Sequence, residues 1–242
     1  MSGHSKWSTI KRKKGALDAA RGKVFTRISK EITLAAKHGG GDAGANPRLR
    51  LAVQNAKAVN MPADNITRAI KKGTGELEGV TYEEVTYEAY APKGIAMIIE
   101  CVTDNRNRTV ADLRHLISKA GGNLGESGSV AWMFERKGVF IVDKTKTEDE
   151  LMEIILDAGA DDLKEDDDAF EIICAMENFE QVRKGLEDKS VNIKNASLQY
   201  IAKDLITIVE KDSADVIRCI EAAEDYDDVQ NVYTNADIEV ED

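Results

Sequence analysis

The spacing of apolar residues changes near Gly79, and this change divides the chain into two kinds of structure. Before it, apolar side chains recur every three or four residues, which is the period of a helix with one buried face. After it, short runs rich in Val, Ile and aromatic residues alternate with turn residues, which is typical of strands. No stretch approaches the ~20 apolar residues that a membrane span needs. The sequence therefore predicts an α+β protein that begins with a helical domain.

The helical part is expected to form three helices. Asn46 and Pro47 supply a cap and a first-turn proline for the second helix, and Gly73 ends the third. The arm before the first helix, residues 1–15, has no period that would bury an apolar face, so we expect it to be disordered when free. The expected helices cover residues 16–38, 46–60 and 62–73.

The rest of the chain divides into two α+β sandwich domains. Residues 136–204 read strand, helix, strand, strand, helix, strand, which is the ferredoxin-like order. The segments on either side, one of which includes an expected strand at Ser129–Phe134, are each too short to close a core. We therefore expect a helical domain over 1–79, a discontinuous domain over 80–135 plus 205–242, and the ferredoxin-like domain inserted in it. Residues 237–242 are expected to form a frayed acidic tail.

Charge is distributed very unequally along the chain. Residues 1–75 contain 16 Lys or Arg and four acids, a net charge of +12, whereas the remainder has 17 basic and 40 acidic residues, a net charge of −23. This asymmetry indicates a nucleic-acid-binding segment attached to a body that repels nucleic acid. The alternative is a basic domain that docks on the acidic body.

Two rows of cations stand out at helical spacing. On the first helix they lie opposite the apolar stripe, and the third helix repeats the design. We expect both rows to be exposed and to contact phosphates without reading bases, so that replacing Lys23, Arg27 and Lys30 would barely change folding stability. An ordinary solvated helix face is the alternative. The rows are Lys23, Arg27, Lys30 and Lys37 on the first helix, and Arg68, Lys71 and Lys72 on the third.

Two further segments are candidate nucleic-acid contacts. Trp7 lies among the cations of the arm, where it can stack on a base or fold back on the helical domain. Arg106 and Arg108 lie where a strand passes into a helix, and this segment reads either as a phosphate site or as a capped turn. The remaining candidates in the arm and at the start of the first helix are Lys6, Lys11, Arg12, Lys13, Lys14 and Arg21.

The inventory of catalytic groups is poor. No Cys, Ser or carboxylate stands at a motif spacing to any of the three histidines, and the glycines match no nucleotide-binding loop. Cys101, Cys174 and Cys219 lie in apolar runs and are expected to be buried structural residues of a cytoplasmic protein. We therefore predict a protein that is not an enzyme and that has no metal, cofactor or small-molecule substrate. The oligomeric state is left open.

Several stretches of the chain resemble the YebC/PmpR family. They are residues 3–14, Arg21–Phe25, Asn60–Pro62 with Ile66, Lys71–Gly73, Thr103–Thr109 and Gly128–Trp132. The resemblance implies a three-domain fold with an N-terminal helical domain, nucleic-acid binding and a role in gene expression. The family is described as DNA-binding transcriptional regulators, while other members act at the ribosome on translation.

Three functions are therefore compared. The first, favoured by the family description, is a DNA-binding regulator of transcription. The second is a ribosome-associated translation factor that binds RNA, which the lysine-rich rows favour slightly, because no recognition helix is evident. The third is a protein-interaction module whose basic domain docks an acidic partner.

Overall fold

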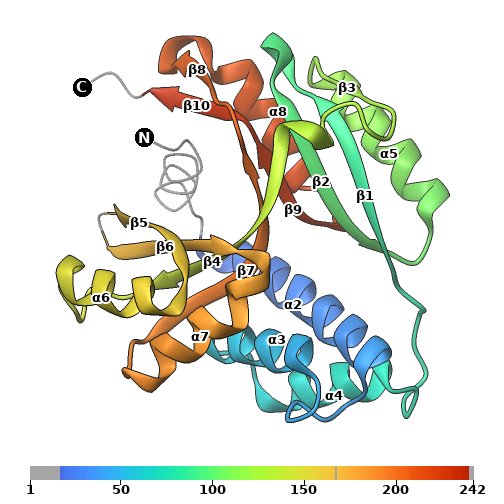
Figure 1. Cartoon of the computed structure of the whole chain (residues 1–242). Coiled ribbons are helices and arrows are strands. Elements are labelled where there is room, and N and C mark those ends of the chain that lie inside the picture. The colour runs from blue at the N-terminus through green and yellow to red at the C-terminus, as the bar shows by residue number, and fades with distance from the viewer. Residues whose placement is uncertain (1–16, 167, 240–242) are drawn as a thin grey trace.

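A computed structural model describes residues 17–166 and 168–239, with side chains from Gly22 onward. The N-terminal domain contains α2 (Leu17–Gly39), α3 (Pro47–Ala58) and α4 (Ala63–Gly73) (Figure 1). Asn46 caps α3 as predicted, because its side-chain oxygen accepts a hydrogen bond from the Leu49 N–H at 3.1 Å. Its amide group also donates to the Ala35 carbonyl of α2 at 2.8 Å. One side chain thus starts α3 and ties it to α2.

Gly73 lies where the end of α4 packs closely against α2. A Cβ at this position would lie 2.3 Å from the Thr33 carbonyl oxygen and 2.7 Å from the Ala36 Cβ. Because backbone of α2 would have to move, Gly73→Ala is expected to lower the free energy of unfolding by about 1–3 kcal/mol, although alanine favours helix. Denaturant titration measures the loss. Gly22→Ala on α2 is the control, because nothing lies within 4 Å of its Cβ position; an equal loss in both variants would contradict the prediction.

The middle domain is an antiparallel sheet with two helices on one face. Leu113 and Ile117 of α5 share a core with Val216 and Ile220 of α8, under the same face of the sheet. A short parallel pair of strands, β8 and β10, adjoins this core through Ile208. The sheet order is β3-β1-β2-β9. The elements are β1 (Glu83–Tyr90), β2 (Ala96–Thr103), α5 (Arg106–Lys119), β3 (Asn123–Leu124), β8 (Ile206–Val209), α8 (Ala214–Glu224), β9 (Val229–Thr234) and β10 (Ala236–Glu239).

The third domain has the predicted ferredoxin-like topology. Its sheet order is β5-β6-β4-β7, and every neighbouring pair is antiparallel. Phe140 of the central strand is fully buried beneath both helices and stacks on Phe179 with ring centroids 4.6 Å apart. The fold-class prediction is confirmed. The elements are β4 (Phe134–Val142), α6 (Glu148–Ala158), β5 (Ala160–Asp166), β6 (Ala169–Ala175), α7 (Phe179–Asp188) and β7 (Ile193–Ala202).

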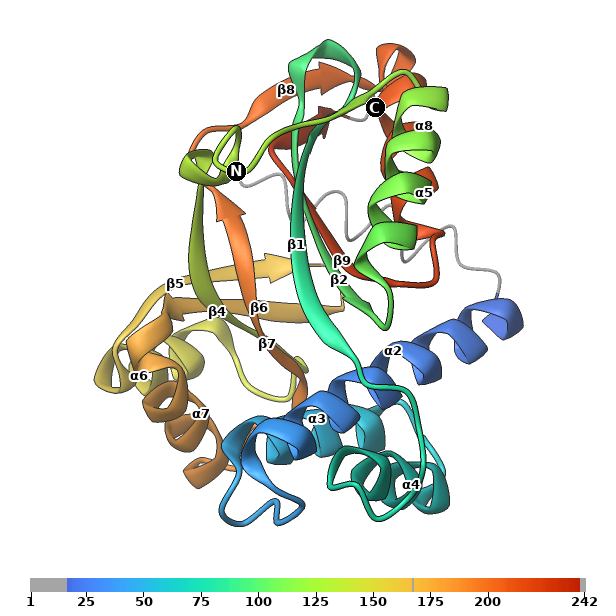
Figure 2. The ribbon, with the colours of Figure 1, turned by 90° about the vertical axis from the view of Figure 1, so that its right-hand side faces the viewer.

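The three domains are joined by direct contacts. The start of β4 and the end of β7 pack on the outer face of the middle sheet, where Phe134, Ile98 and Tyr233 are buried together. From the other side, the Asn55 amide of α3 donates to the Ala196 carbonyl of β7 at 3.1 Å. Figure 2 shows β4 and β7 beside the middle sheet, with α2 running beneath that sheet.

The expected strand at Ser129–Phe134 is wrong. Residues Ala131–Met133 form a 3-10 turn, and β4 begins only at Phe134, so that residue 136 lies inside this strand. The cause is Glu88, whose carboxylate accepts backbone N–H bonds from Gly128 at 2.6 Å, Val130 at 2.6 Å and Ala131 at 2.8 Å. Burial alone would raise the pKa of Glu88, but these three N–H groups lower it.

The end of the chain also needs correction, because residues 237–239 of the expected frayed tail belong to β10, where Ile238 is buried. The helix α5 begins at Arg106, because Asn105 caps it by accepting from the Arg108 N–H at 3.1 Å. No helix in the described ranges is long and apolar enough to cross a membrane.

Candidate nucleic-acid interface

The predicted cationic face of α2 lies against the acidic loop between α8 and β9. The Lys23 ammonium is 2.9 Å from the Asp225 carboxylate, and the Arg27 guanidinium donates to the Glu224 carbonyl at 2.6 Å. Burial lowers the pKa of Arg27, although Glu224 and Asp225 partly offset this effect. Further along the helix, the Lys37 ammonium donates to the Tyr82 carbonyl at 3.0 Å.

Lys30 is the most deeply engaged of these cations. Only 8 % of the residue is exposed. Its ammonium donates to the Asp228 carboxylate at 3.1 Å, to the Asp227 carbonyl at 2.9 Å and to the Val102 carbonyl at 3.1 Å. All three donor positions are thus used within the chain. Lys30 has none left for a phosphate.

Asp228 accepts hydrogen bonds from several side chains where α2 meets the acidic loop. Besides Lys30, its carboxylate accepts from the Arg108 guanidinium at 3.0 Å and from the Thr109 hydroxyl at 2.9 Å. Burial alone would raise the pKa of Asp228, but the hydrogen bonds from Arg108, Lys30 and Thr109 lower it. The carboxylate is therefore charged at neutral pH and joins α2 to both β9 and α5.

The expectation that the α2 row is exposed is therefore wrong for Lys30, and Lys23 and Arg27 are half-buried with partners. Helical periodicity correctly placed these side chains opposite the apolar stripe, but it carries no information about what covers them. The acidic loop that covers them is distant in the chain, since 198 positions separate Lys30 from Asp228. For this face, the alternative of a basic domain docked on an acidic body describes the structure.

The arginines at the start of α5 behave differently from each other. Arg108 is held by Asp104 at 2.7 Å as well as by Asp228, and these partners raise its pKa. Arg106 is largely exposed, and its nearest carboxylate, on Glu83, is 3.9 Å away. Asn105 caps the helix, so the capped-turn reading describes this segment, and Arg106 alone is open to an anion.

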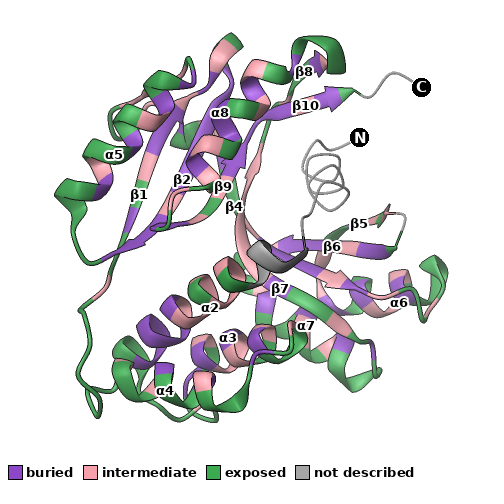
Figure 3. Ribbon diagram, turned by 180° about the vertical axis from the view of Figure 1, so that it is seen from behind, coloured by how far each residue is buried: buried purple, intermediate pink, exposed green. Residues whose placement is uncertain are grey.

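The α4 row is open. Arg68, Lys71 and Lys72 are all exposed, and none of them has an ionic or hydrogen-bond partner within the described part of the chain. In Figure 3 the outward side of α4 is coloured as exposed. The arm candidates Lys6, Trp7, Lys11, Arg12, Lys13 and Lys14 lie outside the described residues, as does the side chain of Arg21.

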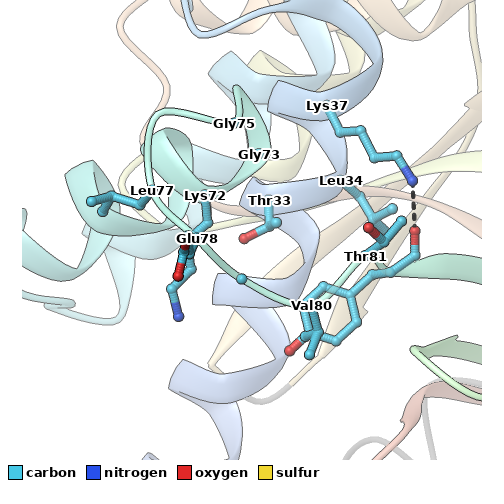
Figure 4. A pocket seen from close by; sticks show the side chains of 12 residues that line it. Thr33, Leu34, Lys37, Lys72, Gly73, Gly75, Leu77, Glu78, Val80 and Thr81 are labelled. Atoms are coloured by element: carbon cyan, nitrogen blue, oxygen red, sulfur yellow. Dashed lines mark hydrogen bonds between the residues drawn. The ribbon is translucent and has the colours of Figure 1, made fainter.

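A groove adjoins this row where α4 ends. It has a volume of about 280 Å³ and lies between α2, the last turn of α4 and the segment that leads to β1 (Figure 4). Lys37 and Lys72 line it together with the exposed apolar side chains of Leu77 and Val80. Glu78 is the acid in its wall. The sequence did not point to this groove, since its segment has no motif.

Comparison with known proteins assigns the family. The model of the TACO1/YebC protein N-terminal domain matches residues 5–76, and the model of the TACO1/YebC second and third domain matches residues 82–236. This chain belongs to the TACO1/YebC family. The two matches together span all three domains of the structure. The resemblance seen in the sequence is thereby confirmed.

Relatives in this family are closely similar over their whole length. A protein of Desulfotalea psychrophila named "Probable transcriptional regulatory protein" is 56% identical over 100% of this chain and 97% of its own. A protein of the same name from Pelodictyon phaeoclathratiforme is also 56% identical, over 98% and 96%. The crystal structure of a conserved hypothetical protein from Aquifex aeolicus has a TM-score of 0.86 at 44% identity and covers 93% of both chains.

The described residues of this TACO1/YebC chain offer little reactive chemistry. Cys101, Cys174 and Cys219 are buried, and burial raises the pKa of Cys101 to about 12 and that of Cys174 to about 11. These thiols therefore stay protonated at neutral pH. His38 and His115 are exposed on helices. No cluster of His, Cys, Asp or Glu suited to a metal ion occurs among the described residues.

Sequence reasoning missed two contacts between the helical domain and the middle domain. Asp225 and Asp228 were counted only as part of an acidic body, although an acidic pair after a helix was visible as a signal. Arg48 was not singled out, yet it lies 2.8 Å from Glu31 and also pairs with Glu84 of β1. Both sites join the helical domain to the middle domain.

Proposed function

We propose that this chain is a DNA-binding regulator of transcription that acts by binding and not by catalysis. The names of its close relatives support a regulatory role. The observation that carries the proposal is the α4 row, in which Arg68, Lys71 and Lys72 project from one side of a helix without partners in the described residues. Because Lys23, Arg27 and Lys30 of α2 are engaged by the acidic loop, the α4 row is the predicted cationic row that remains free to neutralise phosphates.

The proposed contact set is therefore smaller than the sequence suggested. It comprises the α4 row and Arg106, with the arm residues Lys6, Trp7, Lys11, Arg12, Lys13, Lys14 and Arg21 as further proposed contacts. Lys30 is left out, because its three donors are used by Asp228 and by the Val102 and Asp227 carbonyls. Arg108 is left out, because its Nη2 group is held by Asp104 and Asp228. Such a surface contacts the backbone and not the base edges, so we expect tight binding with weak sequence preference.

Replacing Arg68, Lys71 and Lys72 together by Gln is expected to weaken binding to duplex DNA and to change its salt dependence. If the three side chains contact three phosphates, the slope of log affinity against log salt should flatten by about 2.7. Thermal stability should change little, because exposed charges contribute little to folding. Fluorescence anisotropy with a labelled duplex over a series of salt concentrations measures both affinity and slope.

The control variant removes three positive charges from other parts of the surface. Lys119, Lys184 and Lys189 are exposed and have no partner within the described residues, so their triple Gln variant should keep most of the slope. Equal losses in the two triple variants would remove α4 from the interface. A chain that binds no nucleic acid at low salt would contradict the function, and a strong preference for ribosomal RNA over duplex DNA would move it to translation.

A further inference from the structure

We propose that the groove at the end of α4 receives an unpaired nucleotide of single-stranded nucleic acid, and this inference rests on the proposed function. The groove is continuous with the free cations of α4, since Lys72 belongs to both. Its volume of about 280 Å³ is just below the range of ~300–1,000 Å³ that is typical of small-molecule sites. That size suits a single nucleotide and excludes a duplex.

The apolar part of the groove matches the face of a base. Leu77 and Val80, which are 42 % and 53 % exposed, line the groove from a segment without regular structure. Paired and stacked bases cannot reach such side chains, whereas an unpaired base can pack on them. The methylene groups of Lys72 lie against Gly79, which keeps the lysine stem along the wall and its ammonium at the rim.

The polar part of the groove matches the edges of a base and its phosphate. The N–H groups of residues 78–81 have no hydrogen-bond partner within the described part of the chain, so they are available to a ligand. Lys37 uses one donor on the Tyr82 carbonyl and has two left. Because Glu78 also lines the groove, a phosphate is repelled from that wall and is drawn to Lys72 and the α4 row. The base is thereby directed toward the segment before β1.

The test compares single-stranded and duplex DNA in the full chain. Leu77→Ser combined with Val80→Ser removes the apolar surface without changing charge, and Leu156→Ser is the control, because Leu156 is 65 % exposed on α6 of the third domain. Anisotropy is measured with a labelled oligothymidine and with a hairpin duplex of equal phosphate number. We expect the double variant to bind oligothymidine about tenfold more weakly and the duplex within about twofold of the original chain.

Each other outcome is decisive. Unchanged oligothymidine binding, or equal losses on both probes, would overturn the groove as a nucleotide site while leaving the α4 interface in place. Failure of the unaltered chain to bind either probe would contradict the proposed function itself. As a second measurement that needs no variant, oligothymidine containing 4-thiothymidine is photocrosslinked to the unaltered chain and the adduct is mapped. An adduct within the tryptic peptide Gly73–Lys93 supports the site, and adducts confined to other peptides overturn it.

Discussion

Asp228→Ala is expected to lower the free energy of unfolding by about 3–5 kcal/mol, because it leaves the buried ammonium of Lys30 without its counter-ion. The same change removes one acceptor of Arg108 and one of Thr109, so three donors from two domains lose a partner together. Chemical denaturation followed by circular dichroism measures the loss. We also expect the helical domain to detach at lower denaturant than the rest of the chain.

The control for this prediction is Asp225→Ala. Asp225 pairs with Lys23 in the same loop, but its side chain is 84% exposed. An exposed pair contributes about 1 kcal/mol or less. If Asp225→Ala and Asp228→Ala destabilise the protein equally, the buried pair does not hold the domains together. The same reasoning reverses the expectation from sequence that replacing Lys23, Arg27 and Lys30 leaves stability nearly unchanged, because Lys30→Gln alone now leaves Asp228 short of a buried partner.

Glu88→Gln is expected to lower the free energy of unfolding by about 3 kcal/mol, because hydrogen bonds to a charged acceptor contribute about 1.5–3 kcal/mol each. One of the two side-chain oxygens becomes an amide group that faces backbone N–H donors of the turn before β4. The turn also positions Trp132, whose indole N–H donates to the Ser129 carbonyl at 3.1 Å. A change in Trp fluorescence that accompanies the loss of stability would locate the damage in this turn.

The Glu88 effect has a defined pH dependence. Its pKa is lower in the folded chain than the ordinary value of 4.5. Its contribution is therefore fully present above about pH 4.5 and disappears as the pH falls through the folded pKa. Unfolding measured across this range should be less pH-dependent in Glu88→Gln than in the original chain. Glu126→Gln, in the same loop but exposed, should follow the original chain, and a parallel profile for all three proteins would contradict the role of Glu88.

Local signals in the sequence predicted most of the elements. Asn46 and Pro47 marked the start of α3, and the order of strands and helices after residue 136 was sufficient for the ferredoxin-like topology. Both succeed because caps and hydrophobic periods act over a few residues. The strand expected at Ser129–Phe134 was wrong, because its apolar residues suggested an extended backbone. The Glu88 carboxylate, 40 or more positions away in the chain, holds this segment in a turn.

For the candidate site, the sequence predicted which residues are basic and on which helix faces they lie, but not what they contact. Charge counting located a basic domain, and periodicity placed its cations on helix faces, so the exposed position of Arg68, Lys71 and Lys72 was predicted from the sequence. Neither signal distinguishes an open face from a docked one, since a lysine that contacts a phosphate and a lysine that contacts an aspartate occupy the same helical positions. The groove beside Lys72 arises from α2, α4 and a segment without a motif, which meet only in the folded chain.

Most of the helices and strands of this protein, and the charge of each part, could be predicted from the sequence, because they follow from neighbours within a few positions. Which cations remain free depends instead on contacts between residues that are far apart in the chain. The reason is electrostatic. A buried carboxylate such as Asp228 pairs with Lys30 once folding brings them to 3.1 Å, while no carboxylate among the described residues pairs with the cations of α4.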